Sequence, residues 1–499
     1  MSDKRKLFVI GIGGTGSRVI KSLSLLLASG CTLKGGFTNI IPIIIDPDNS
    51  NGDLMRTMEI LNLYQKIRIN IDGVDKGEFF NQKIQSLKSN NRYDNIDFRF
   101  FLKGVDTNTF ENYIGFRNLN EDYTKSTDDK NFIRLLYSKK NLKSELKVGF
   151  KGHPNMGTVV LDQITQSETF KYFVDKCDKD DAIFLINSIF GGTGAAGLPL
   201  LLKSIKSQEK LKNTKIGAIT YLPYFEIGKK DPEIEAADPE EIKSNSFLEK
   251  TKVAIAYYNR TIIENKELDS IYFIGHETNS INHEYEHHIG ANLQKNDANF
   301  LELAGSLAIF DFCESPKKTE NKPLVKEYGL DKSFDGEIEF DHLSKRDRDV
   351  IERNLACFKV FSDYLLEEKG LKRALGVSRW TLDRISSIGG PKYKNSTLTD
   401  SYFEGAEYTS SVETFIHHFR DWLDEMRKNY PAFAPFPKTC NSKDALRVLP
   451  GKPFKGFRSI DRENNRLISS RKIWPHDTTK VHSALFRLFE HSIRKFVSK

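Results

Sequence analysis

The sequence lacks any apolar run that approaches the ~20 residues of a membrane-spanning helix. The apolar stretch near the start is too short for a signal peptide and runs into glycines, so a strand is expected there. The five cysteines are far apart with no paired spacing, which argues against a zinc ribbon or a disulfide framework. No internal repeat or low-complexity tract is evident. The scattered cysteines without paired spacing fit a reducing cytoplasm.

The charge of the chain is unevenly distributed along its 499 residues. Residues 441–499 contain 14 Lys and Arg against 5 Asp and Glu, a net charge of +9 within a chain of net charge +7. The rest of the sequence therefore sums to −2. A solvated basic face explains this basic region, and so does a surface for an acidic protein, an anionic membrane or nucleic acid. The length predicts at least two domains.

Two glycine-rich loops follow apolar runs that are typical of buried strands. The first loop, residues 11–16 (GIGGTG), follows the predicted strand 7–10. The second loop, residues 191–197 (GGTGAAG), follows the predicted strand 181–186, and each loop precedes a predicted helix. Such a loop binds anions, because free backbone N–H groups and the positive end of the helix dipole face the ligand. One loop alone is equally explained as a glycine-rich turn, but two together favour a phosphate site.

Three further stretches carry polar groups suited to a nucleotide. They are Asp46 after the predicted strand 40–45, the loop 152–157 (GHPNMG), which is informative only through its place in the order of these stretches, and Asn296, Asp297 and Asn299 at the start of an apolar helix predicted for 296–312. An acidic residue at the end of the second strand can meet a ribose. An amide beside a purine edge can both donate and accept hydrogen bonds. The alternative for the third stretch is that its polar residues merely cap the helix.

The order of these stretches resembles that of the tubulin/FtsZ family over roughly residues 5–312. The family signature corresponds to Gly191-Gly192-Thr193-Gly194, followed here by two alanines where the family has a small residue and then glycine. The resemblance implies a divergent prokaryotic GTP-binding protein, with Mg²⁺ beside the nucleotide, that is a GTPase and assembles head to tail into filaments. The nucleotide-binding residues that it implies are Gly11, Gly13, Gly14, Thr15, Gly16, Asp46, Asn155, Gly157, Gly191, Gly192, Thr193, Gly194, Ala195, Asn296, Asp297 and Asn299.

Hydrolysis in that family also needs an acidic loop after the central helix. Glu320, Glu327 and Asp331 lie in the corresponding region but do not form the expected motif. No catalytic residue is therefore assigned, and a nucleotide-dependent interaction protein that does not hydrolyse GTP remains an alternative.

A second alternative is a ThiF-like adenylating enzyme that uses ATP. Asp46, Asp48, Asn51 and Arg56 resemble the acidic strand end, asparagine and arginine of that family. This alternative leaves the second glycine loop without a role.

The segment 283–287 (HEYEH) is a literal H-E-x-x-H pattern, which binds zinc when a packed helix presents both histidines. Its short polar setting favours a surface cluster of histidine and glutamate. No metal ligand is assigned from it.

The alternation of strands and helices predicts an α/β fold with a doubly wound parallel sheet. The resemblance implies that this sheet belongs to a tubulin/FtsZ-like nucleotide-binding domain, followed by a mixed α/β C-terminal domain. The predicted boundaries are 1–295 for the first domain, with an elaboration at about 70–147, 296–314 for a central connecting helix, and 315–499 for the C-terminal domain. Residues 317–340 are charged and predicted to be a loop.

Overall fold

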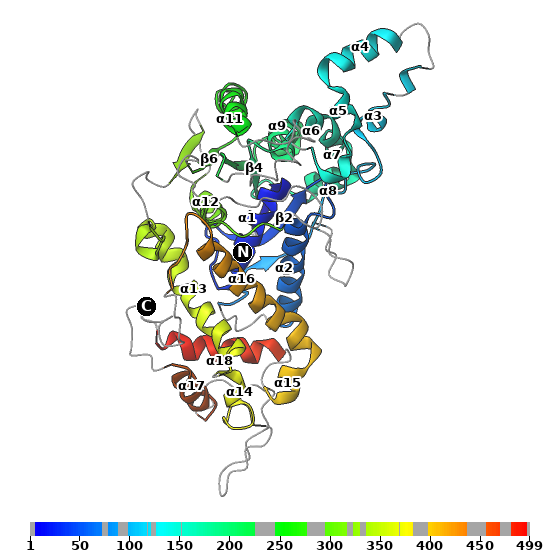
Figure 1. Cartoon of the computed structure of the whole chain (residues 1–499). Helices are drawn as coiled ribbons and strands as arrows, with labels where there is room; N and C mark the ends of the chain where they lie inside the picture. Colours follow the sequence, from blue (N-terminus) through cyan, green and yellow to red (C-terminus); the bar gives the residue numbers. More distant parts are fainter. Residues whose placement is uncertain are drawn as a thin grey trace, which may run out of the picture.

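The computed structural model describes residues 5–71, 78–87, 98–116, 118–120, 126–150, 152–224, 245–276, 295–316, 323–329, 336–368, 370–382, 398–436, 456–469 and 481–496. Within these ranges a seven-stranded sheet, parallel throughout, forms the centre of the N-terminal part (Figure 1). Its strands are β1 (Arg5–Ile12), β2 (Phe37–Ile45), β3 (Lys83–Ile84), β4 (Ala182–Ser188), β5 (Lys215–Tyr221), β6 (Ser270–Ile274) and β7 (Leu324–Tyr328).

The order of the strands defines where the chain reverses direction across the sheet. The order is β3-β2-β1-β4-β5-β6-β7. The chain therefore proceeds from β1 through β2 to β3 toward one edge of the sheet, and from β4 through β5 and β6 to β7 toward the opposite edge. β1 and β4 pair directly, with Leu7 opposite Ala182 and Gly11 opposite Ile186. In open α/β sheets ligands bind beyond the carboxyl ends of the strands at this switch point.

The helices that follow β1 and β4 flank the sheet on opposite faces, because right-handed crossovers that run in opposite directions place their helices on opposite sides. α1 (Gly13–Ala28) packs on β1 and β4 and against α12 (Phe300–Glu314). α9 (Gly192–Ser207) packs on β4 and against α6 (Pro154–Leu161). The apolar residues of β1, β4 and β5 are buried on both faces, which is typical of parallel strands.

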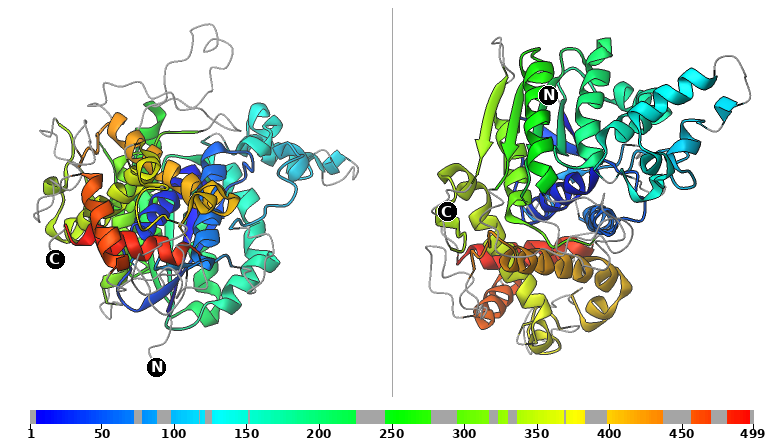
Figure 2. Two further views of the ribbon diagram at one scale, coloured as in Figure 1. Left: turned by 90° about the horizontal axis from the view of Figure 1, so that it is seen from below. Right: turned by 45° about the horizontal axis from the view of Figure 1, so that its top comes forward.

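The remaining helices of the N-terminal part lie around this core. They are α2 (Gly52–Ile69), α3 (Phe110–Tyr113), α4 (Ser126–Leu136), α5 (Lys139–Lys143), α7 (Gln163–Gln166), α8 (Glu168–Lys176) and α11 (Asn245–Tyr258). α3, α4 and α5 belong to an arm that projects from the body of the molecule (Figures 1 and 2). No helix among the described residues combines the length and apolar character needed to cross a lipid bilayer.

The described residues from 336 onward are mostly helical. Their helices are α13 (Lys345–Leu366), α14 (Leu371–Ala374), α15 (Asp400–Glu404), α16 (Thr414–Lys428), α17 (Phe457–Ser469) and α18 (Val481–Arg494). An aromatic cluster joins α13, α16 and α18, with Phe358 packed edge-on against Phe419 and Phe361 tilted against Phe486. α16 contacts α2 and α13 contacts α1, so this helical part lies directly against the N-terminal part (Figure 1).

The predicted α/β fold with a doubly wound parallel sheet is confirmed. The prediction of a loop over 317–340 is wrong for Leu324–Tyr328, which forms β7. This strand pairs with β6 at the edge of the N-terminal sheet, although it lies within the predicted C-terminal domain. Its two adjacent charged residues, Lys326 and Glu327, hid it, because an edge strand is only partly shielded from water. The H-E-x-x-H segment at 283–287 lies outside the described residues.

Candidate functional site

The two glycine loops meet at the switch point of the sheet. Gly11 ends β1, and Gly13, Gly14, Thr15 and Gly16 form the first turn of α1. Gly13 has φ +74°, a conformation that glycine adopts without strain. A Cβ added to Gly13 would lie 3.5 Å from the Thr193 Cβ and 3.7 Å from the Gly194 nitrogen. The predicted phosphate loops therefore lie side by side.

Both helices that begin at these loops have ends suited to an anion. The residues before α1 and α9, Ile12 and Gly191, make no side-chain cap, and neither helix has an acidic residue in its first turn. By contrast, α12 and α13 are capped by the side chains of Asn299 and Ser344. The first N–H groups of an uncapped helix have no intrahelical partner, and the dipole adds positive potential there. The N-termini of α1 and α9 therefore lie close together beyond the carboxyl ends of β1 and β4.

The predicted loop 152–157 packs against the second glycine loop. A Cβ on Gly192 would lie 2.9 Å from the Phe150 Cβ and 3.1 Å from the Gly152 nitrogen. Gly157 is equally crowded, since a Cβ there would lie 3.0 Å from the Gly192 oxygen. Glycine is thus required for this close approach of α6 to α9.

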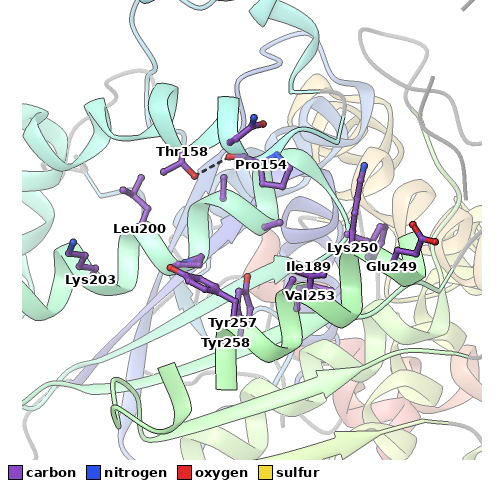
Figure 3. Close-up of a pocket in the computed structure, with 16 residues that line it drawn as sticks. Pro154, Thr158, Ile189, Leu200, Lys203, Glu249, Lys250, Val253, Tyr257 and Tyr258 are labelled. Carbon is purple, nitrogen blue, oxygen red and sulfur yellow. Dashed lines mark hydrogen bonds between the residues drawn. The ribbon is translucent and has the colours of Figure 1, made fainter. Parts of the chain in front are cut away.

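Asn155 lies farther out than the glycines of its loop. Its side chain is exposed and its Oδ1 accepts a hydrogen bond from the Met156 nitrogen at 3.0 Å. Asn155 and Ala195 line a mainly apolar pocket of about 770 Å³ between α6, α9 and α11 (Figure 3). The apolar lining makes this pocket unsuited to a triphosphate.

Asp46 follows β2, the strand next to β1 in the sheet. Its side chain is buried and accepts a hydrogen bond from the Asp48 nitrogen at 3.0 Å. Burial raises the pKa of Asp46 to about 7, and the nearby charges of Asp48 and Asp53 add to this rise. The hydrogen bond from Asp48 opposes the shift without cancelling it.

A buried ionic network runs beneath the first glycine loop. The Arg18 guanidinium pairs with Asp53 of α2 at 2.8 Å and with Glu302 of α12, and it donates to the Tyr224 hydroxyl at 2.8 Å. Burial alone would raise the pKa of Asp53, but the charges of Arg18 and Arg56 outweigh it and hold that pKa below its usual range. The network ties α1 to α2 and α12.

The network continues to the predicted base-reading residues at the start of α12. Asn296 is buried, and both its backbone nitrogen and its Nδ2 donate to Asp53, at 3.0 and 2.9 Å. Its Oδ1 is buried and has no hydrogen-bond partner. Burial raises the pKa of Asp297, and the charge of Glu425 raises it further. Asn296 thus offers an unused acceptor, and Asp297 an exposed carboxyl group.

Asn299 is occupied by its own helix. Its Oδ1 accepts from the Leu301 nitrogen at 2.8 Å, which caps α12. Its Nδ2 donates to Asn429 and to the Tyr430 carbonyl, both at 3.3 Å. Asn299 therefore positions the start of α12 and is less available to a ligand than Asn296.

The residues that resemble an adenylating enzyme are also engaged within the protein. Asn51 caps α2, since its Oδ1 accepts from the Asp53 nitrogen at 2.9 Å. Arg56 donates to Asp53 at 3.0 Å and to Glu425 at 2.6 Å. These contacts weaken the adenylating alternative, because neither side chain is directed to a ligand.

Four residues of the buried network were not predicted from the sequence: Arg18, Asp53, Tyr224 and Glu302. One signal was available, because Arg18 and Lys21 are charged residues within an otherwise apolar helix that must bury its sides. Such residues require buried partners, but the sequence does not say which carboxylates supply them.

Charged groups elsewhere bear on the remaining predictions. In the described ranges, no three His, Cys, Asp or Glu side chains gather closely enough to hold a metal ion. Glu327 is exposed on β7, and the other two acidic residues considered for hydrolysis lie outside the described residues. In the basic region 441–499, Arg466 and Lys495 pair with Glu463, and Arg494 pairs with Glu78. Part of that basic charge is therefore balanced within the protein.

Comparison with known proteins finds similarity in structure only. No protein-family model and no curated protein matches the sequence. Similar solved structures include CetZ from Methanosaeta thermophila strain DSM 6194, with 13% identity and a TM-score of 0.28 over 54% of this chain and 45% of that chain. CetZ2 from Haloferax volcanii, solved as a GTPγS-bound protofilament, has 12% identity and a TM-score of 0.27 over 54% of this chain and 49% of that chain.

A model of the TubZ-Bt two-stranded filament is also similar, with 12% identity and a TM-score of 0.24 over 84% of this chain and 78% of that chain. The chain spans less than half the length of the two CetZ proteins. Because the TM-scores and identities are low, the fold assignment above rests on the strand topology and carries no statement about activity.

Proposed function

We propose that this chain binds GTP in the manner of the tubulin/FtsZ family, with the phosphates held by both glycine loops. The observation that carries the proposal is the convergence of the uncapped N-termini of α1 and α9 at the switch point. Gly11 to Gly16 and Gly191 to Ala195 would supply backbone N–H donors, and the Thr15 and Thr193 hydroxyls would add to them.

The start of α12 would hold the base. Guanine presents N–H donors on its pairing edge, and the unpartnered Oδ1 of Asn296 and the carboxylate of Asp297 are acceptors. Asp46 stands after β2, where an acidic residue meets the ribose in related nucleotide folds. Asn299 would support this arrangement by fixing the first turn of α12.

The chain would act as a filament-forming GTPase of the cytoplasm, with copies joined head to tail. Mg²⁺ would be bound mainly through phosphate oxygens and water, as is usual for this ion beside nucleotides. Its charge would offset the negative charge of the phosphates. Hydrolysis would require a carboxylate placed by the neighbouring copy, because Asp53 and Glu302 beneath the first loop are engaged with Arg18.

The test is the binding and turnover of GTP and ATP by the full chain over a range of protein concentrations. Thr193 is partly exposed in the first turn of α9, so Thr193→Glu places a negative charge in the proposed phosphate site. Glutamate also suits a helix N-terminus, so the fold is preserved. Thr193→Gln has the same size without the charge and serves as the matched control.

We expect GTP binding with turnover that rises with protein concentration, and at least about tenfold weaker binding by Thr193→Glu than by Thr193→Gln. GTP binding without turnover would indicate a nucleotide-dependent interaction protein instead. ATP binding with pyrophosphate release would indicate the adenylating enzyme. Equal affinity of the two variants would show that the loops do not hold the phosphates.

A further inference from the structure

The pocket between α6, α9 and α11 is part of an exposed apolar groove that runs along α9 from the end of the second glycine loop, where Ala195 and Ala196 line it. Pro199, Leu200, Val253 and Tyr257 contribute to its walls (Figure 3). Val253 and Tyr257 are 73% and 51% exposed, one helical turn apart on α11. Apolar side chains that remain exposed together on a polar-rimmed surface mark an interaction site.

The rim of the groove carries a net positive charge. Lys203 of α9 and Lys250 of α11 lie on it together with one acidic residue, Glu249. Lys250 donates a hydrogen bond to the Gly152 carbonyl at 3.1 Å. Burial lowers the pKa of Lys250, so a carboxylate brought to this rim would gain more than one in open water.

The α4 helix presents a second exposed apolar surface on the projecting arm. Phe132, Leu135 and Leu136 are 62%, 84% and 52% exposed, and they share a helical face with the acidic residues Asp128 and Asp129.

The opposite face of α4 is anchored to the arm. Lys130 and Arg134 lie over the Phe116 ring at 5.7 and 5.8 Å, and Ile133 packs against the core. This contact fixes the orientation of the helix, so Phe132, Leu135 and Leu136 face outward. Of the twelve large hydrophobic side chains that are exposed in the described ranges, seven lie on α4, α6 or α11.

We propose that α4 of one copy of this chain docks into the groove of a second copy. Leu135 and Phe132 would enter the apolar groove, while Asp128 and Asp129, adjacent at one end of α4, would meet Lys250 at one end of the groove (Figure 3). The lengths agree, because Asp128 to Leu136 and Ala195 to Lys203 each span eight helical rises, or about 12 Å. An amphipathic helix laid in an apolar groove is a recurrent mode of recognition.

Within one chain the two surfaces lie apart, since the arm projects on the side of the body away from α11 (Figures 1 and 2). The contact is therefore heterologous and either closes a ring or continues as a filament. It touches the second glycine loop only at Ala195 and Ala196, and nucleotide is not part of the proposed contact.

The test measures self-association of the full chain without nucleotide by sedimentation velocity. Leu135→Glu alters the arm, Val253→Glu alters the groove, and Val377→Glu is the matched control. Val377 is 77% exposed in the turn after α14, far from both surfaces in the sequence. All three positions are exposed, so each variant should fold, which circular dichroism verifies.

We expect self-association by the parent chain, at least about tenfold weaker association of the arm and groove variants, and no change for Val377→Glu. A mixture of the arm variant and the groove variant should form a 1:1 complex, because one retains an intact groove and the other an intact arm. A monomeric parent chain, a monomeric mixture, or a groove variant that still associates would overturn the proposal. Thr193→Glu should associate like the parent, which separates this test from that of nucleotide binding.

Discussion

Arg18 holds together three parts of the candidate site. Its guanidinium is buried between Asp53, Glu302 and the Tyr224 hydroxyl, so α1, α2 and α12 meet at one side chain. The planar guanidinium can donate to all three at once, which a lysine ammonium does less well. The geometry of the first glycine loop and of the base-reading residues thus depends on one buried cation.

Replacing Arg18 by methionine should lower the free energy of unfolding by about 3–5 kcal/mol, because it leaves Glu302 buried without its cation and Asp53 with Arg56 alone. Arg18→Lys should lose less. The measurement is urea unfolding followed by circular dichroism. Arg348→Met is the control, since the Arg348–Asp341 pair is exposed and should contribute about 1 kcal/mol or less. Equal losses for Arg18→Met and Arg348→Met would contradict the role of the network.

Asp46 should make stability fall as pH rises. Its pKa is about 7 in the folded chain against 3.8 for the free side chain, so between these values the folded state binds more protons than the unfolded state. The free energy of unfolding therefore decreases with rising pH through that window. Asp46→Asn lacks this decrease, so the variant should gain stability relative to the parent as the pH rises from about 4 to about 7.

The pH dependence is measured as the difference in thermal unfolding temperature between Asp46→Asn and the parent. Glu490 also has a pKa raised to about 7 by burial, but it is present in both proteins and cancels in the difference. A difference that stays constant with pH would show that Asp46 is ionised normally in the folded chain.

At the residue scale, the glycines of the two loops could be predicted from the sequence, but the buried ionic network beneath the first loop could not. Close backbone approach leaves a readable sign, since only glycine fits at Gly157 and Gly192. The partners of Arg18 leave none, because Glu302 is 284 residues away and buried ion pairs have no fixed spacing along a chain.

At the scale of elements, the buried strands were the most predictable. β4 was expected over 181–186 and lies at Ala182–Ser188, because a continuous apolar run of this length is typical of a strand buried on both faces. Helix starts were less predictable. α12 begins at Phe300, after residues 296–299, because the Asn299 side chain caps it. Capping residues and helical residues share the same polar composition, so the boundary is set by hydrogen bonds that form only in the fold.

The cap of α12 should matter for binding as well as for stability. Asn299→Ala should lower the free energy of unfolding by about 1 kcal/mol and also weaken GTP binding, because it loosens the turn beside Asn296. Ser344→Ala removes the cap of α13 and should cost a similar free energy without changing GTP affinity. Unfolding and nucleotide titrations of both variants test this. Equal GTP affinities of Asn299→Ala and Ser344→Ala would show that the start of α12 does not contact the guanine base.

At the scale of the whole molecule, the C-terminal helices contribute to the candidate site. Glu425 of α16 pairs with Arg56 at 2.6 Å and with Lys21 at 3.4 Å, and it accepts from the Ala298 nitrogen at 2.8 Å. Burial opposes its ionisation, but Lys21 and Arg56 outweigh burial and lower the pKa of Glu425. The predicted domain boundary at residue 315 separates Glu425 from these three partners. Composition alone does not show which helices of two predicted domains contact each other.

The central claim is that the two glycine loops hold one nucleotide together. The most direct measurement is amide hydrogen exchange of the full chain with and without GTPγS, because exchange reports the protection of individual backbone N–H groups. The account predicts that GTPγS protects residues 13–16 of α1 and 192–195 of α9 at the same ligand concentration. Protection of one loop without the other, or protection of neither, would contradict it.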